Sequence, residues 1–398
     1  MRWSSSLCIL SSWFLNISNT CPLGDREDAH ATTLQARDNT FWRRVRIGGG
    51  LGADNSAGQI SDVFTVGDSS TPGGCSAQMN TVNAWLKDAI TLQDAIVKAY
   101  SNYKSDKGLR QTWEFIFGIE FDGNDVDMDD LLTKMLWPAI GKRIAGVTQY
   151  LEKAASFKPW IFCSEMAGSL QQWDQPIKDK NGKEIASKLG PDGKPEDYYT
   201  LRQVFQTQAS TPDMKAFYME AFKGYDFYTN KYNSLCGDGN RYAATSRYID
   251  RAAGNPLVPQ VDITSATRNV IFCPTSFSPP NGGQHSFPSL SMAVSSGYYP
   301  PYGGDWNIGQ PNIEKYIPVS GTFYHELYHL TDVGDTADPY RHMIHIYMAA
   351  RQQAANNADN PESYLYMAMA TYMFLNPPQG KDAVLFPAGV PKKASDVK

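Results

Sequence analysis

The residues with the most definite chemistry in this chain lie in the stretch HELYH, residues 325–329. In a helix, His325 and His329 are four positions apart and share one face, so both imidazoles can reach one ion. Glu326 would point beside that ion, toward a water molecule whose proton it could accept and later deliver to a leaving amine. The pattern predicts a Zn²⁺ site with Glu326 as catalytic base. Two ordinary helical histidines are the plainer interpretation, which the scarcity of histidine in the chain disfavours.

A catalytic zinc takes three protein ligands and keeps one position open. The candidates for the third ligand are Asp335, Asp338, Glu362, His342 and His345. The two histidines would serve only if the following helix folded back unusually closely. Asp338 could instead be a helix N-cap, and Glu362 could be an acid that the helix dipole favours in a first turn. Spacing alone leaves the choice open.

The stretch GTFYHELYHLTDVGDTADPY, residues 321–340, resembles the aspzincin metalloendopeptidases, the deuterolysin and peptidyl-Lys metalloendopeptidase group. Their pattern has Gly-Thr before HExxH and Gly-Thr-x-Asp after it. This chain matches it at Gly321-Thr322, Thr336 and Asp338, and departs from it at Asp335, where the family has glycine. The resemblance implies a zincin-like endopeptidase that cuts protein or peptide substrates, with zinc held by His325, His329 and Asp338.

The resemblance also implies roles for three further residues. The family places a tyrosine three residues after the ligand aspartate to stabilise the oxyanion. That position holds Arg341 here, and we assign the catalytic role to the adjacent Tyr340. In the lysine-selective members an Asn-Ala-Asp segment presents two carboxylates to the substrate, which correspond to Asp359 and Glu362 in NADNPE. Ordinary helix-start acids are the alternative, and Glu362 cannot be both a zinc ligand and a lysine acceptor.

Helices must position most of these residues. Apolar residues recur at a helical period in residues 80–103 and 130–155, the second helix being broken or kinked at Pro138. We predict further helices within 213–232, 318–331, 339–355 and 361–375, with Asp338 and Asn360 as N-caps before prolines. RNVIFCP, residues 268–274, predicts a buried strand. The expected fold is α+β and mainly helical, a zincin-like metalloprotease domain with a small sheet at the active-site cleft.

Composition divides the chain into four parts. Residues 1–30 are predicted to be a signal peptide, and the Gly- and Ser-rich residues 31–74 a propeptide or flexible arm. Residues 75–376 form the metallopeptidase domain, with a polar surface insertion at 172–200 whose turns are marked by Asn-Gly and Asp-Gly. Residues 377–398 are predicted to be an extended tail. His285 lies in a long Pro-, Gly- and Ser-rich loop and is expected to be solvated rather than a ligand.

Charge and cysteine content limit the partners and the compartment. A net charge of −5 offers no basic surface for nucleic acid, and no stretch is apolar for long enough to span a membrane. Four of the six cysteines follow residue 30 without a CxxC pair, which favours two disulfides in a secreted protein. The resemblance implies the pairs Cys75–Cys163 and Cys236–Cys273. We expect a monomer.

Two other functions are compatible with the sequence. The chain could be a catalytically silent secreted binding protein or effector that retains a zincin scaffold, as the departures at Asp335 and Arg341 and the large insertion suggest. It could also be a cytosolic helical protein with a chance motif, which predicts free thiols.

Overall fold

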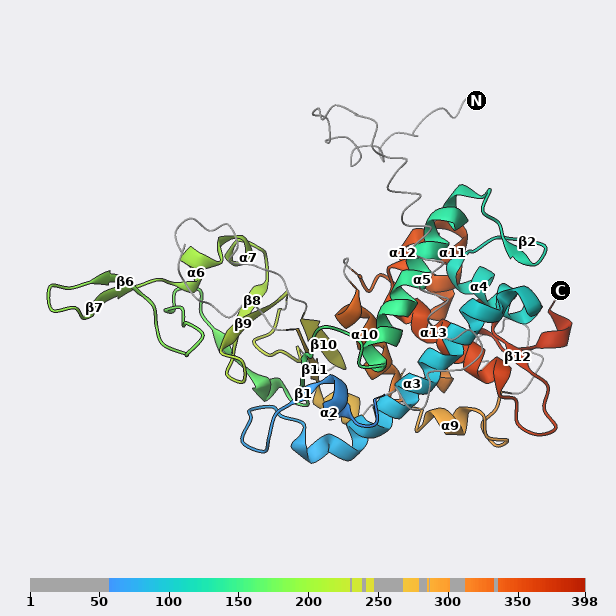
Figure 1. The fold of residues 1–398 in the computed structure, drawn as a ribbon, viewed down its shortest axis with the longest axis horizontal. Coiled ribbons are helices and arrows are strands. Elements are labelled where there is room, and N and C mark those ends of the chain that lie inside the picture. The colour runs from blue at the N-terminus through green and yellow to red at the C-terminus, as the bar shows by residue number, and fades with distance from the viewer. Residues whose placement is uncertain are drawn as a thin grey trace, which may run out of the picture. The chain divides into compact units, whose positions relative to one another are not determined.

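A computed structural model describes residues 57–229, 231–237, 241–246, 268–278, 285, 287–300, 312–332 and 336–397. The predicted signal peptide at 1–30, the arm up to residue 56 and Asp335 lie outside the described residues. The described chain is α+β, as predicted (Figure 1). Among its helices, none has the length and apolar character needed to cross a membrane.

A four-stranded sheet lies beside the helix that carries the HELYH stretch. Its order is β1 (Thr65–Val66), β4 (Trp160–Phe162), β11 (Asn269–Phe272) and β10 (Ala243–Ser246). The first three strands are parallel, and β10 runs antiparallel to β11 with Thr245 opposite Val270. The strand predicted in RNVIFCP is therefore confirmed as β11. β10 stands at the end of this sheet and packs against α10 (Gly321–Thr331).

The remaining core is helical. Its helices are α3 (Met79–Asn102), α4 (Lys107–Phe117), α5 (Leu131–Leu151), α11 (Met343–Gln352), α12 (Ala354–Ala358) and α13 (Pro361–Leu375). α10 packs against α3, α5 and α13. Almost every residue of α13 is buried, which is typical of a helix enclosed on all sides. Short helices α2 (Ile60–Val63), α8 (Pro274–Phe277) and α9 (Leu290–Ala293) and the two-stranded ladder of β2 (Phe121–Asp122) with β3 (Asp125–Val126) complete this part.

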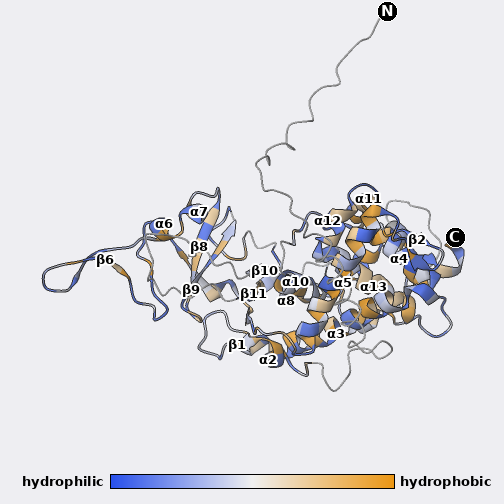
Figure 2. Cartoon of the chain, turned by 45° about the horizontal axis from the view of Figure 1, so that its top comes forward, coloured by the Kyte–Doolittle hydropathy of each residue, from blue (hydrophilic) through white to orange (hydrophobic). Residues whose placement is uncertain are grey.

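Residues 168–229, which contain the predicted insertion, form a small lobe with its own core. β5 (Gly168–Gln171), β8 (Met214–Met219) and β9 (Gly224–Thr229) make an antiparallel sheet, and α6 (Leu201–Val204) and α7 (Gln206–Ala209) precede β8. The two predicted turns are confirmed, with Gly182 and Gly193 at positive φ. The second turn joins β6 (Ala186–Leu189) to β7 (Pro195–Tyr198), a hairpin coloured mostly hydrophilic in Figure 2.

The helix predicted within 213–232 is wrong, because this segment is the β8–β9 hairpin. Methionine, alanine and glutamate suggest a helix locally. However, the segment is rich in aromatic residues, and β8 has strand partners on both edges, β5 and β9. Buried packing of Phe217 and Tyr225 then outweighs the local preference.

The predicted domain limits also need correction. Residues 57–74 are not an arm, because Ile60 and Phe64 are buried and β1 pairs with β4. Residues 377–398 are not simply extended, because β12 (Val384–Leu385) pairs with β13 (Lys392–Lys393) and its side chains are buried.

Two helix predictions differ in detail. α5 continues through Pro138 as one helix, since buried neighbours such as Trp137 and Ile140 hold it against the core. The helix predicted from Pro339 begins only at Met343, so Asp338 is not an N-cap and belongs to an irregular segment. Asn360 does precede α13 as predicted, but its side chain makes no capping bond there and donates to the carbonyl of Tyr340.

Both predicted disulfides, Cys75–Cys163 and Cys236–Cys273, are confirmed. The first joins the start of α3 to the end of β4, and the second joins the segment before β10 to the end of β11. Paired cysteines are typical of a protein that folds in an oxidising compartment. The free-thiol alternative does not fit this arrangement.

The buried side chain of Gln93 in α3 forms hydrogen bonds with α5 and α10. The amide of Gln93 donates to the carbonyl of Ile144 and the hydroxyl of Thr148, both at 2.8 Å. Its carbonyl accepts from the hydroxyls of Tyr324 (2.8 Å) and Tyr328 (3.3 Å). The contacts join three helices, α3, α5 and α10, around one side chain.

We expect Gln93→Leu to lower the free energy of unfolding by about 1–3 kcal/mol, because buried hydroxyl groups lose their acceptor. Urea denaturation measures this change. Thr91→Ala, at a less buried position of the same helix, is the control and should change stability by less than about 0.5 kcal/mol. Equal midpoints for the two variants would contradict the role of Gln93.

Candidate metal centre and catalytic site

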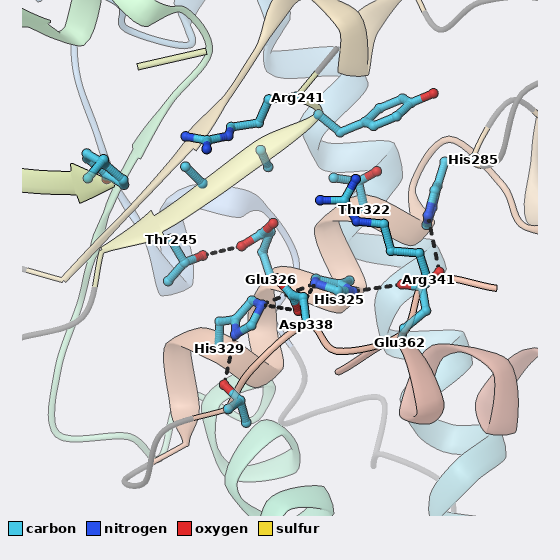
Figure 3. Close-up of a pocket in the computed structure, with 15 residues that line it drawn as sticks. Arg241, Thr245, His285, Thr322, His325, Glu326, His329, Asp338, Arg341 and Glu362 are labelled. Atoms are coloured by element: carbon cyan, nitrogen blue, oxygen red, sulfur yellow. Dashed lines mark hydrogen bonds and ion pairs between the residues drawn. The ribbon is translucent and has the colours of Figure 1, made fainter. Parts of the chain in front are cut away.

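Three side chains converge at one point beside α10, as Figure 3 shows. The Nε2 atoms of His325 and His329 are 3.2 Å apart. Oδ1 of Asp338 lies 3.2 Å from the first and 2.9 Å from the second. The side chain of Asp338 is 42% exposed, so this corner of the triangle faces solvent.

The triangle fits a tetrahedral zinc ion. Zinc bonds of about 2.0–2.1 Å at the tetrahedral angle separate neighbouring ligand atoms by about 3.3 Å. The three observed separations are close to that value, and two imidazoles with one carboxylate are a donor set that zinc accepts in catalytic sites. The exposed side leaves room for the open position that catalysis needs.

The other nitrogen of each imidazole has its own partner. Nδ1 of His325 lies 2.8 Å from Oε2 of Glu362, and Nδ1 of His329 lies 2.8 Å from the hydroxyl of Thr336. With both Nδ1–H groups donating, both Nε2 lone pairs face the triangle. Such second contacts hold the tautomer and ring orientation of metal-binding histidines.

The charged side chains of the site influence one another's pKa. Burial opposes protonation of His325, but the hydrogen bonds to Asp338 and Glu362 outweigh it and raise the pKa of the imidazole well above its ordinary value. Burial also opposes ionisation of Asp338, yet hydrogen bonds from His325 and His329 hold its pKa well below the usual range. Glu362 is buried too, and the charge and hydrogen bond of His285, with His325, hold its pKa at about 2. The negative charges of Asp338 and Glu362, which stabilise a protonated imidazole at His325, would also stabilise a divalent cation bound there.

Glu326 is held by the edge strand. The hydroxyl of Thr245 in β10 donates to Oε2 of Glu326 at 2.5 Å. Glu326 is 7% exposed and lines the same cavity as the three candidate ligands. One carboxylate oxygen is thus engaged by Thr245.

If Glu326 is the base that the sequence predicts, Thr245→Val should lower kcat/KM for peptide hydrolysis about 10- to 100-fold, because a hydrogen bond to a charged group contributes about 1.5–3 kcal/mol. Zinc content should not change. Thr331→Val is a matched control, since that hydroxyl donates to the backbone of α10 rather than to the site. Equal activity in both variants would contradict a positioning role for Thr245.

A cavity of about 560 Å³ opens over the triangle. Its lining residues come from β10 and the segments beside it, from α10, from residues 336–341 and from α13. They include Tyr228, Arg241, Tyr242, Thr245, His285, Glu326, Arg341 and Glu362. β10 therefore borders the cavity along its length, which confirms the prediction of a small sheet at the cleft.

The structure places Tyr340, the predicted oxyanion donor, away from the cavity. Its hydroxyl donates to the side chain of Gln353 at 3.0 Å and it does not line the cavity. Its neighbour Arg341 does line the cavity. Residues 339–341 are irregular, so no helical or strand period distinguishes one side chain from the next.

The two predicted lysine acceptors are engaged elsewhere. Asp359 forms an ion pair with Arg143 at 2.6 Å and does not line the cavity. Arg143 also contacts Asp332 at the end of α10, so Asp359 helps to tie α12 to that helix. Its carbonyl accepts the N–H of Ala337, which anchors the segment that carries Asp338. Glu362 lines the cavity, but its oxygens face His325 and His285.

The alternative third ligands take other positions, apart from Asp335, which lies outside the described residues. Glu362 contacts Nδ1 of His325 rather than the metal-facing Nε2. His342 lies 3.2 Å from Glu314, and neither His342 nor His345 lines the cavity.

Three residues of the site were not identified from the sequence. Thr336 carries a weak signal, since it belongs to the Thr-x-Asp pair of the resemblance. Thr245 carries none, because it lies 81 residues before Glu326. His285 was expected to be solvated, but it is only 9% exposed and contacts Glu362.

Comparison with known proteins adds little to this geometry. No protein-family model and no solved structure matches the chain. A stretch of 146 residues is 37% identical to a Penicillium expansum protein described as "Non-secreted LysM effector LysM17". The match covers 33% of this chain and 19% of that protein, so the chain spans less than a fifth of that relative's length.

Proposed function

We propose that this chain is a zinc-dependent endopeptidase with a zincin-like domain, secreted from the cell. The observation that carries the proposal is the triangle of His325, His329 and Asp338 with Glu326 beside it in one cavity. The two disulfides and the resemblance to the aspzincins support it further.

Each residue of the site has a separate role in the proposed reaction. His325, His329 and Asp338 would hold Zn²⁺, which when bound supplies a Lewis acid and lowers the pKa of water. Glu326, oriented by Thr245, accepts the proton of the attacking water and passes it to the leaving amine nitrogen. Arg341 donates to the negative charge that develops on the substrate's carbonyl oxygen.

The edge strand supports an extended peptide as the substrate. Among the residues that the structure describes, β10 is the last strand of its sheet, and it lines the cavity through residues 243–245. Backbone groups at a sheet edge can pair with an added strand, which holds a peptide without regard to its side chains. An internal peptide bond would then lie across the cavity, as endopeptidase activity requires.

We leave lysine selectivity out of the proposal. Asp359 is paired with Arg143 outside the cavity, and both oxygens of Glu362 face histidines. A substrate lysine would have to displace these partners to reach either carboxylate.

The proposal is tested by incubating the purified full chain with a peptide library, with and without a zinc chelator. Zinc content is measured on the same sample. We expect internal cleavage that the chelator abolishes and added zinc restores. A chain that holds about one zinc and cleaves no peptide would overturn the enzymatic proposal.

That outcome would favour the second candidate, a catalytically silent secreted binding protein or effector. One observation favours it, namely the word "effector" in the description of the Penicillium relative. Zinc would then stabilise the fold without catalysis, and Glu326→Gln would leave every measured property unchanged.

A further inference from the structure

A line of three buried side chains leads away from the metal triangle. Nδ1 of His325 lies 2.8 Å from Oε2 of Glu362, whose Oε1 lies 3.5 Å from Nε2 of His285. The side chains are 15%, 4% and 11% exposed in that order. Figure 3 shows Glu362 between the two rings, with His285 reaching it from the far side.

Glu362 needs both partners. A buried carboxylate is costly unless hydrogen bonds replace the water that it loses. His325 engages one oxygen, and His285 is the donor nearest to the other. Oε1 is buried and has no hydrogen-bond partner within the usual distance among the described residues, so Nε2 of His285 at 3.5 Å is its one ion-pair contact there.

The position of His285 is held tightly. Its φ is +56°, a left-handed conformation that few residues other than glycine adopt. A Cβ at Gly321, the first residue of α10, would lie 3.0 Å from Nδ1 of His285. The ring of Tyr242 packs against it at 5.7 Å between centroids. Unfavourable backbone that surrounding contacts maintain is often found at functional sites.

We propose that His285 is a positioning residue of the metal centre. It holds the carboxylate of Glu362, and Glu362 in turn fixes the ring plane and tautomer of His325. Its Nε2 faces Glu362, and it is not part of the ligand triangle. This inference rests on the proposed metal centre. It concerns the orientation of the His325 ring, which sets the direction of Nε2 toward the ion.

Two substitutions of His285 distinguish the loss of its contact with Glu362 from a change in backbone strain. His285→Asn keeps a residue that tolerates positive φ, but its amide is too short to reach Glu362. His285→Gln places an amide N–H at about the reach of the imidazole Nε2. We expect the Asn variant to bind zinc about 10-fold more weakly and the Gln variant to regain most of that affinity.

The measurements do not depend on peptidase activity. Zinc affinity of the full chain is measured by competition with a chromophoric chelator, and folding is checked by circular dichroism. The visible absorption of the Co²⁺ form reports ligand geometry, and we expect it to change in the Asn variant and return in the Gln variant. His342→Ala is the matched control, because it removes another histidine–glutamate contact outside the cavity, with Glu314 at 3.2 Å.

Failure of this inference and failure of the metal centre are distinguishable. A wild-type chain that binds neither Zn²⁺ nor Co²⁺ overturns the metal centre. If wild type binds zinc, a folded Asn variant with wild-type affinity and cobalt spectrum overturns the role of His285. A folded Gln variant that is no better than Asn does the same, because the donated bond would then not be what matters.

Discussion

Replacing Glu326 with glutamine is expected to lower kcat/KM for peptide hydrolysis by about 10²–10⁴-fold without changing the zinc content. Glutamine has nearly the shape of glutamate, and its amide can still contact the hydroxyl of Thr245. It cannot accept the proton of the attacking water. The loss would therefore reside in kcat, with little change in the affinity for peptide.

The control for this substitution is Glu314→Gln. Glu314 also accepts hydrogen bonds, from the N–H of Met343 and beside His342, but it lies outside the cavity. We expect that variant to keep full activity. If Glu326→Gln were as active as Glu314→Gln, Glu326 would not be the base, whatever the zinc content.

Asp338→Ala is expected to remove zinc from the purified protein, from about one ion per chain to nearly none after dialysis. The aspartate supplies one of the three ligand atoms and the only negative charge of the triangle. Its side chain is 42% exposed, so its removal should not unfold the chain. Elemental analysis measures the metal, and circular dichroism verifies the fold.

Two further variants make the result specific. Asp359→Asn is the matched control, since Asp359 is a nearby carboxylate outside the cavity, and it should retain zinc. Glu362→Gln should also retain zinc, but with an affinity about 10–100-fold lower, because Glu362 orients a ligand rather than acting as one. Full zinc in Asp338→Ala together with loss in Glu362→Gln would reverse these roles.

The histidine pair of the candidate metal site could be predicted from local sequence. His325 and His329 share a helix face because of their spacing alone, and the structure confirms the helix at Gly321–Thr331. Asp338 follows His329 by nine residues, and the resemblance singled it out among the candidates. Local spacing also identified both Gly turns of the insertion and the strand β11.

Elsewhere local signals were insufficient. The segment 213–232 has residues that suit a helix, yet strand partners on both edges of β8 make it a hairpin. Of Tyr340 and Arg341, the second lines the cavity although the sequence analysis chose the first, because an irregular segment has no period that shows which side chain faces the cavity.

By itself, then, the sequence determined the His-Glu-His arrangement, since helix geometry is a local property. Spacing left the third ligand open, and only the resemblance singled out Asp338. Only the tertiary structure determined which side chains contact and orient those residues. Thr245 reaches Glu326 because β10 stands at the end of the sheet beside α10, and His285 reaches Glu362 because Gly321 leaves space for its ring. These contacts join residues about 80 positions apart in the chain, where spacing carries no information and packing alone decides what meets.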